Sequence, residues 1–141
     1  MADRKFIESL NIEDNVFELK KNSTISYLVQ YFAPYTGAGE YEIPAGTKFC
    51  MYGPMRDDAM YMNIVGDVDS NLFEALKEKE KKTIPQLSTR ITGFSFYITE
   101  EQMEELPLNF ISGSRERCLE IFELIRQNDR EFITKFLNDN I

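Results

Sequence analysis

Apolar and polar side chains alternate with a period of two over much of the first half of the chain. In residues 24–33, one face carries the side chains of Ile25, Tyr27, Val29, Tyr31 and Ala33. This period is typical of a β-strand with one buried face. The same pattern, bounded by glycine and proline, predicts further strands over residues 40–43, 47–52, 59–65 and 90–98. Short strands joined by turns predict a small antiparallel, strongly bent sheet.

Two segments beside these strands are less regular. Residues 34–39 begin with proline and contain two glycines, so they are predicted to form the loop of a wide hairpin. Residues 16–20 fit either a helical turn or a first strand, and we favour the strand.

Helical patterns flank the predicted sheet. A short N-terminal helix is predicted over residues 3–10, where apolar residues recur at helical spacing behind an aspartate. A second helix is predicted to begin near Asn71, which has capping-box spacing with Glu74. Its second half, residues 77–82, consists of Lys and Glu alone and is predicted to stand in solvent.

The C-terminal part of the chain is predicted to be helical. Thr99 and Gln102 have the spacing of a capping box, which predicts a short helix that ends before Pro107. A longer helix is predicted after Ser112, and a final helix after Asn128. Their apolar stripes are Cys118, Ile121, Phe122 and Ile125 in the first, and Phe132, Ile133, Phe136 and Leu137 in the second. These stripes predict a helical hairpin packed on the sheet.

Together these elements predict an α+β fold. Their order fits a small open barrel of the SH3-like or OB-like kind, with a helix before the last strand and the helical hairpin packed on it. A chain of 141 residues has the size of one domain. We therefore expect a single domain over residues 1–141, mainly β in residues 1–98 and helical in residues 99–141.

The chain is acidic, with a formal net charge of −8 at pH 7. Residues 99–141 hold 10 acidic and 5 basic side chains, so much of this charge lies in the predicted helical layer. Because clustered Lys and Arg side chains drive binding to phosphates, we expect no nucleic-acid partner and favour a protein partner with a basic surface. No apolar run approaches the roughly 20 residues that span a bilayer, and the N-terminus lacks the apolar core of a signal peptide. We expect a cytoplasmic protein that does not bind membranes.

The sequence lacks the usual catalytic and metal-binding patterns. Histidine is absent, which removes the commonest general base and the usual catalytic zinc ligand. Cys50 and Cys118 have no metal-site spacing and are expected to be reduced packing residues. Asp67, Asp69 and Asn71 have the spacing of a calcium loop, but leucine stands where that loop needs glycine. We therefore expect no catalytic site, no metal and no cofactor.

Six of the seven tyrosines lie in residues 24–67, the stretch that holds most of the predicted strands. Tyrosine joins a large apolar ring to a polar hydroxyl and is common at the centre of protein interfaces. The candidate binding residues are four of these tyrosines and two glutamates that attract a basic partner, namely Tyr35, Tyr41, Tyr52, Tyr61, Glu104 and Glu105. Tyr35 and Tyr41 flank the glycine-rich segment, so we expect the site to be centred there.

These observations predict two functions from different classes. The first is a non-catalytic, acidic protein-interaction module of the inhibitor or immunity type, which binds a basic partner. The alternative is a sensor domain that holds a small apolar ligand in the mouth of the barrel, beneath Tyr35 and Tyr41. A cavity of roughly 300 Å³ or more is needed for the alternative.

Overall fold

A computed structural model describes residues 4–32, 35–66, 70–83 and 91–140 of the chain. The described residues form one antiparallel sheet of seven strands, in the order β3-β2-β6-β5-β4-β1-β7. The strands are β1 (Val16–Leu19), β2 (Ser23–Phe32), β3 (Tyr35–Ile43), β4 (Lys48–Arg56), β5 (Ala59–Ile64), β6 (Gly93–Thr99) and β7 (Leu108–Ser112). Since β3 and β7 are edges, the sheet is open, and the α+β fold class is confirmed.

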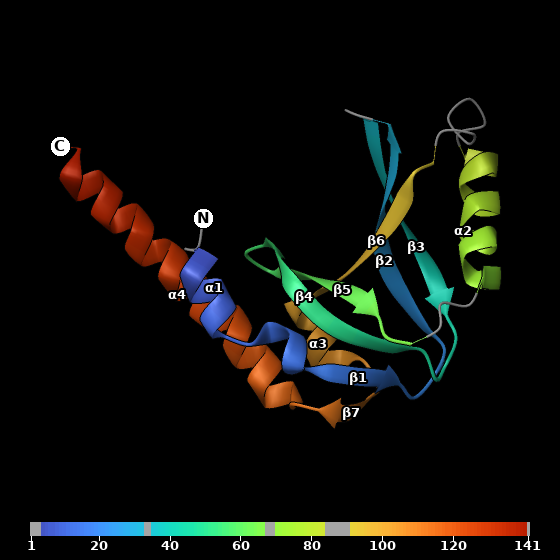
Figure 1. Cartoon of the computed structure of the whole chain (residues 1–141), viewed down its shortest axis with the longest axis horizontal. Coiled ribbons are helices and arrows are strands. Elements are labelled where there is room, and N and C mark those ends of the chain that lie inside the picture. The colour runs from blue at the N-terminus through green and yellow to red at the C-terminus, as the bar shows by residue number, and fades with distance from the viewer. Residues whose placement is uncertain (1–3, 33–34, 67–69, 84–90, 141) are drawn as a thin grey trace.

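Figure 1 shows helices at both ends of this bent sheet. They are α1 (Arg4–Ser9), the 3₁₀ helix η1 (Ile12–Asp14), α2 (Ser70–Thr83), α3 (Glu100–Glu105) and α4 (Arg115–Asp139). α2 stands beside β3 at one end of the molecule, whereas α1 and α4 lie at the other. Different helices therefore pack at the two ends of the sheet.

The sheet has an inner and an outer face. Buried apolar side chains from all seven strands and from α2, α3 and α4 form one cluster on the inner side. Cross-strand pairs within this cluster are Phe17 with Phe49, Met51 with Met62, Met60 with Ile98, and Tyr27 with Phe96. Because side chains alternate along a strand, the residues between them, such as Tyr52 and Tyr61, belong to the outer face.

Most of the predicted elements are confirmed. The strands predicted over residues 24–33, 47–52, 59–65 and 90–98 correspond to β2, β4, β5 and β6. Residues 16–20 form β1, and the N-terminal helix is α1. The side chains and backbones of Thr99 and Gln102 form the capping box that begins α3.

The glycine-rich segment is a strand and not the predicted loop. β3 begins at Tyr35, and Gly37 and Gly39 pair with Val29 and Tyr27 of β2. A Cβ atom added to Gly39 would lie 2.6 Å from the hydroxyl oxygen of Tyr27. Glycine at this position therefore makes room for the tyrosine ring over the strand.

Two further features of the sheet differ from the prediction. β4 continues through Gly53 and Pro54 to Arg56, with register shifts against β5 where proline is tolerated. β7 pairs with β1, so β6 is not the last strand, and the helix before the last strand is α3. In β7 only Leu108 is buried, so its sequence carries little alternation.

The predicted helical hairpin is a single continuous helix, α4. Asn128 and Asp129, which were expected to begin a second helix, lie inside it. No glycine or proline interrupts residues 115–139, so the backbone has no reason to break.

α4 has a buried half and an exposed half. Its first half contributes four side chains to the core, namely Cys118, Ile121, Phe122 and Ile125. Residues 130–140 are exposed, and Figure 1 shows this half extending away from the sheet. Its large apolar side chains, here called the α4 stripe, are Phe132, Ile133, Phe136 and Leu137. The helix is therefore longer than the surface that it covers.

Phe122 and Phe136 allow a matched test of this division. Phe122 is 1% exposed and Phe136 is 58% exposed. Phe122→Ala should lower the free energy of unfolding by about 3 to 5 kcal/mol, because it leaves a cavity in the core. Phe136→Ala should change it by less than about 0.5 kcal/mol in the monomer. Chemical denaturation at low protein concentration measures both, and equal losses would show that the whole of α4 packs on the domain.

Candidate functional site

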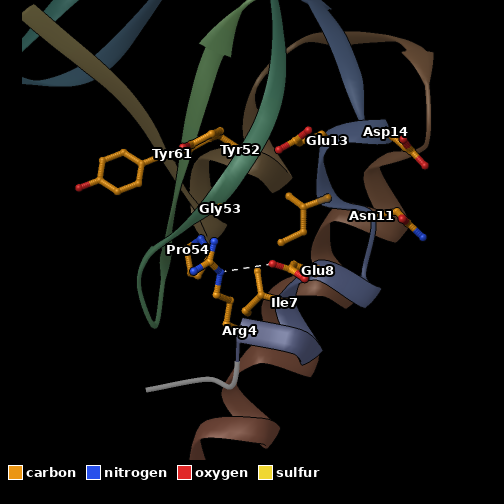
Figure 2. A pocket seen from close by; sticks show the side chains of 11 residues that line it. Arg4, Ile7, Glu8, Asn11, Glu13, Asp14, Tyr52, Gly53, Pro54 and Tyr61 are labelled. Atoms are coloured by element: carbon orange, nitrogen blue, oxygen red, sulfur yellow. Dashed lines mark hydrogen bonds and ion pairs between the residues drawn. The ribbon is translucent and has the colours of Figure 1, made fainter.

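A cleft of about 620 Å³ lies on the outer side of the sheet, between the N-terminal helices and the β4–β5 hairpin. Figure 2 shows tyrosines on one side of it and acidic side chains on the other. Its lining consists of Arg4, Ile7, Glu8, Asn11, Ile12, Glu13, Asp14, Tyr52, Gly53, Pro54 and Tyr61. Segments from the first 14 residues and from the middle of the chain therefore build one site.

Strand alternation explains the aromatic side of the cleft. In β4, Phe49 and Met51 face the core, so Tyr52 points outward and is 55% exposed. Tyr61 lies between two buried methionines of β5 and is opposite Gly53. A Cβ on Gly53 would meet no atom within 4 Å, so the floor of the cleft there is open.

The acidic side of the cleft is held in place by the turn between α1 and η1. Asn11 adopts a left-handed conformation with φ of 51°, which lets the chain reverse its direction. The backbone oxygen of Asn15 accepts a hydrogen bond of 3.1 Å from the amide of Met51, which ties this turn to β4. Glu13 is thereby fixed across the cleft from Tyr52, whereas the carboxylate of Asp14 points away from the cleft, as Figure 2 shows.

The charges of the cleft are mainly negative. Glu8 pairs with the exposed Arg4, with 3.3 Å between Oε1 and Nε. Within the described part of the chain, the carboxylates of Glu13 and Asp14 form no ion pair. Carboxylates beside aromatic rings suit a cationic side chain, because the ring face and the carboxylate both attract positive charge.

The predicted binding residues do not form one site. Tyr52 and Tyr61 meet in the cleft, whereas Tyr41 lies on β3, which three strands separate from β4, and packs half-buried against the core. Tyr35 begins β3, and its side chain lies outside the described residues. The expected position of the site beside Tyr35 and Tyr41 is therefore not supported.

The two predicted glutamates lie on α3, away from the cleft. Glu104 and Glu105 are exposed there, and the backbone oxygen of Glu104 accepts a hydrogen bond from Arg115. The acidic residues that do line the cleft, Glu8, Glu13 and Asp14, were not predicted. Nothing in the sequence links the N-terminal turn to the β4–β5 hairpin, so only the fold shows that these acidic residues line the cleft.

A second cavity, of about 520 Å³, lies between α2 and the strands β5 and β6. Its lining is almost entirely apolar and consists of Met62, Asn63, Ile64, Leu72, Phe73, Leu76, Phe94 and Phe96. The rings of Phe73 and Phe94 meet edge to face, with 5.2 Å between their centroids. This cavity has the size of a small-ligand site, although it does not lie beneath Tyr41.

The sequence also did not predict that a carboxylate on α2 is buried. Glu80 is 5% exposed, although the charged segment 77–82 was expected to stand in solvent. The hydroxyls of Tyr27 and Tyr31 both donate to it, the latter at 2.6 Å from Oε2. Lys79 Nζ donates to the Tyr27 hydroxyl at 3.0 Å and to the backbone oxygen of Glu40 at 2.7 Å. These contacts attach α2 to β2 and β3, so we interpret the cluster as structural.

Other candidate chemistry finds no support in the described residues. Asp67 and Asp69 of the calcium pattern lie outside them, and residues 71–78 of that pattern are helical. Among the described side chains, no group of three His, Cys, Asp or Glu residues can hold a metal. Burial raises the pKa of the Cys118 thiol to about 12, which keeps it protonated at neutral pH. None of the helices in the described ranges is long and apolar enough to cross a membrane.

Comparison of the chain with protein-family models, with curated proteins and with solved structures gives no match. The function is therefore argued from its own residues.

The Tyr27–Tyr31–Glu80 cluster predicts a loss of stability at alkaline pH. Burial, and then the hydrogen bond to Glu80, raises the pKa of Tyr31 from 10.0 to about 12, and the same causes raise the pKa of Tyr27. A tyrosine whose pKa is higher in the folded state stabilises it fully below pH 10, and this contribution is lost as the pH rises through 12.

Denaturation of wild type and of Tyr31→Phe across this pH range measures the effect. The variant should lose less stability than wild type between pH 10 and 12. Tyr52→Phe, on the outer face, is the control and should follow wild type. Identical alkaline profiles for wild type and Tyr31→Phe would contradict the prediction.

Proposed function

We propose that this protein is a non-catalytic interaction module that binds a basic segment of a protein partner in the cleft between α1–η1 and β4–β5. The observation that carries the proposal is that Tyr52 and Tyr61 face Glu8 and Glu13 across one cleft. The net charge of −8 supports the same kind of partner, because it steers basic surfaces toward the protein.

A lysine or arginine side chain fits this arrangement physically. Its aliphatic part can lie on the exposed ring of Tyr52 while its charge meets the carboxylate of Glu13. A cation over an exposed aromatic ring contributes about 0.5 to 1 kcal/mol. A hydrogen bond to a charged group contributes about 1.5 to 3 kcal/mol. The exposed Glu104 and Glu105 contribute mainly to the rate of association.

The rest of the proposal follows the sequence predictions. The absence of histidine supports a protein without catalytic activity. The acidic composition supports a role of the inhibitor or immunity type, and we propose that the protein acts in the cytoplasm. The bent, open sheet supports a barrel-like architecture of the SH3-like or OB-like kind, although seven strands are more than such small barrels use.

Fluorescence anisotropy with labelled oligo-lysine and oligo-arginine tests the site. Tyr52→Ala leaves the net charge unchanged and should raise the dissociation constant about three- to tenfold, through the loss of the ring. Glu13→Gln should raise it by a similar factor. Glu105→Gln makes the same change of charge outside the cleft, and Tyr41→Ala removes a tyrosine elsewhere; both should bind within about twofold of wild type.

The pattern of effects decides between sites. If Glu13→Gln and Glu105→Gln raise the dissociation constant equally and Tyr52→Ala leaves it unchanged, the peptides are attracted by the overall negative charge and do not bind in the cleft. If Tyr41→Ala weakens binding and Tyr52→Ala does not, the binding site lies on β3 and not in the cleft.

The second candidate function is a sensor for a small apolar ligand, and the cavity under α2 favours it. Among the described residues, three phenylalanines, two leucines, an isoleucine and a methionine line this cavity, and Asn63 is the one polar side chain. That composition suits a flat or aliphatic molecule with a single polar atom.

Binding of decanoic acid and of the dye anilinonaphthalene sulfonate tests the second candidate. Ile64→Trp should fill the cavity and lower the affinity for both probes at least about tenfold. Ile111→Trp is the control, since Ile111 is exposed on β7. All proteins should carry Phe136→Glu, because the α4 stripe can also attract the dye. Equal binding with and without Ile64→Trp would exclude the cavity as the site.

A further inference from the structure

The α4 stripe lies on the part of α4 that extends beyond the sheet. Phe132, Ile133, Phe136 and Leu137 are each between 51% and 58% exposed. The residues around them, from 130 to 140, are exposed as well. Contiguous apolar surface of this kind marks an interaction site, and half of a helix standing alone in water is only marginally stable.

The charges on this half of α4 indicate what covers it. Residues 130–140 carry two basic and two acidic side chains, namely Arg130, Lys135, Glu131 and Asp139, so this segment has no net charge. The remainder of the chain carries the whole net charge of −8. A basic partner therefore gains no attraction at this surface, and a second copy of it meets no repulsion.

The spacing of the stripe is self-complementary. Its side chains form two pairs one helical turn apart, at 132–133 and 136–137. When two such helices run antiparallel about a centre between residues 134 and 135, each 132–133 pair lies level with the 136–137 pair of the other copy. A two-fold dimer requires a patch that fits itself in this way. Arg130 then lies level with Asp139 and with the carbonyl end of the other helix, where a cation is favoured.

The apolar surface continues from the stripe toward the domain. Ile7, Met55, Ile125 and Ile133 line a groove of about 540 Å³ between α1, the end of β4 and the middle of α4. In the antiparallel arrangement, residues 137–140 of one copy lie level with residues 129–132 of the other, at the mouth of this groove. The end of each helix thus meets the groove of its partner.

We propose that the protein forms a two-fold dimer in which the α4 stripes of two copies pack antiparallel. This inference goes beyond the proposed function and does not depend on the cleft. Each half-exposed large side chain offers roughly 100 Å² to an interface. Four from each copy give roughly 800 Å² in total, less than the roughly 1,200 Å² of a stable interface. The dimer is therefore weak, and it is best detected at high protein concentration.

Sedimentation equilibrium of the full chain over a range of concentrations tests the proposal. Wild type should show a monomer–dimer equilibrium, and Phe136→Glu should raise its dissociation constant at least about tenfold. Ile111→Glu is the matched control, because Ile111 is 54% exposed on the edge strand β7, and it should dimerise like wild type. Circular dichroism should show that both variants remain folded.

Cysteine cross-linking in a Cys50→Ser background tests the direction of the pair. A mixture of Asn140→Cys and Asp129→Cys copies should form a cross-linked heterodimer on oxidation, because these positions lie level in the antiparallel pair. Asn140→Cys alone should not cross-link, since its two copies are about 16 Å apart along the helix axis.

Three results would overturn the antiparallel α4 dimer. They are a mass that stays monomeric at every concentration, a Phe136→Glu variant that dimerises like wild type, and efficient cross-linking of Asn140→Cys to itself. Loss of the dimer in Ile111→Glu with none in Phe136→Glu would place the interface at the sheet edge.

Discussion

The position of α2 depends on the buried carboxylate of Glu80. A carboxylate taken out of water is costly unless hydrogen bonds replace its hydration, and here Tyr27 and Tyr31 both donate to it. Tyr27 can reach it because Gly39 of β3 has no side chain, since a Cβ there would lie 2.6 Å from the tyrosine hydroxyl oxygen. One interaction therefore explains a glycine of an edge strand and the placement of a highly charged helix.

A second constraint is the length of α4. Its apolar positions recur with helical spacing from Cys118 to Phe136, but the domain covers them only as far as Ile125. A helix without glycine or proline does not end where its cover ends. The same periodic pattern thus stabilises the core in one half and leaves an exposed apolar stripe in the other. Because the stripe is self-complementary and carries no net charge, its simplest partner is the stripe of a second copy, as we propose.

The cleft on the outer face follows from the alternation of β4 and β5. Because Met51, Met60 and Met62 fill the core, the tyrosines between them must point outward. The turn at Asn11 then lays acidic side chains across from these rings. An acidic and aromatic surface on a negatively charged protein suits a cationic side chain, which is the basis of the proposed function.

The sequence alone determined the features that depend on neighbours along the chain. The two-residue period located β2, β4, β5 and β6, and the spacing of Thr99 and Gln102 located the start of α3. Only the tertiary structure decided whether the glycines of β3 turn or pair, whether Glu80 is exposed, and which tyrosines share a site with carboxylates. These outcomes depend on contacts between distant residues, as between Tyr27 and Glu80, which are 53 positions apart. A local pattern sets the period and the polarity of an element, whereas the identity of its neighbours is set by the packing of the whole chain.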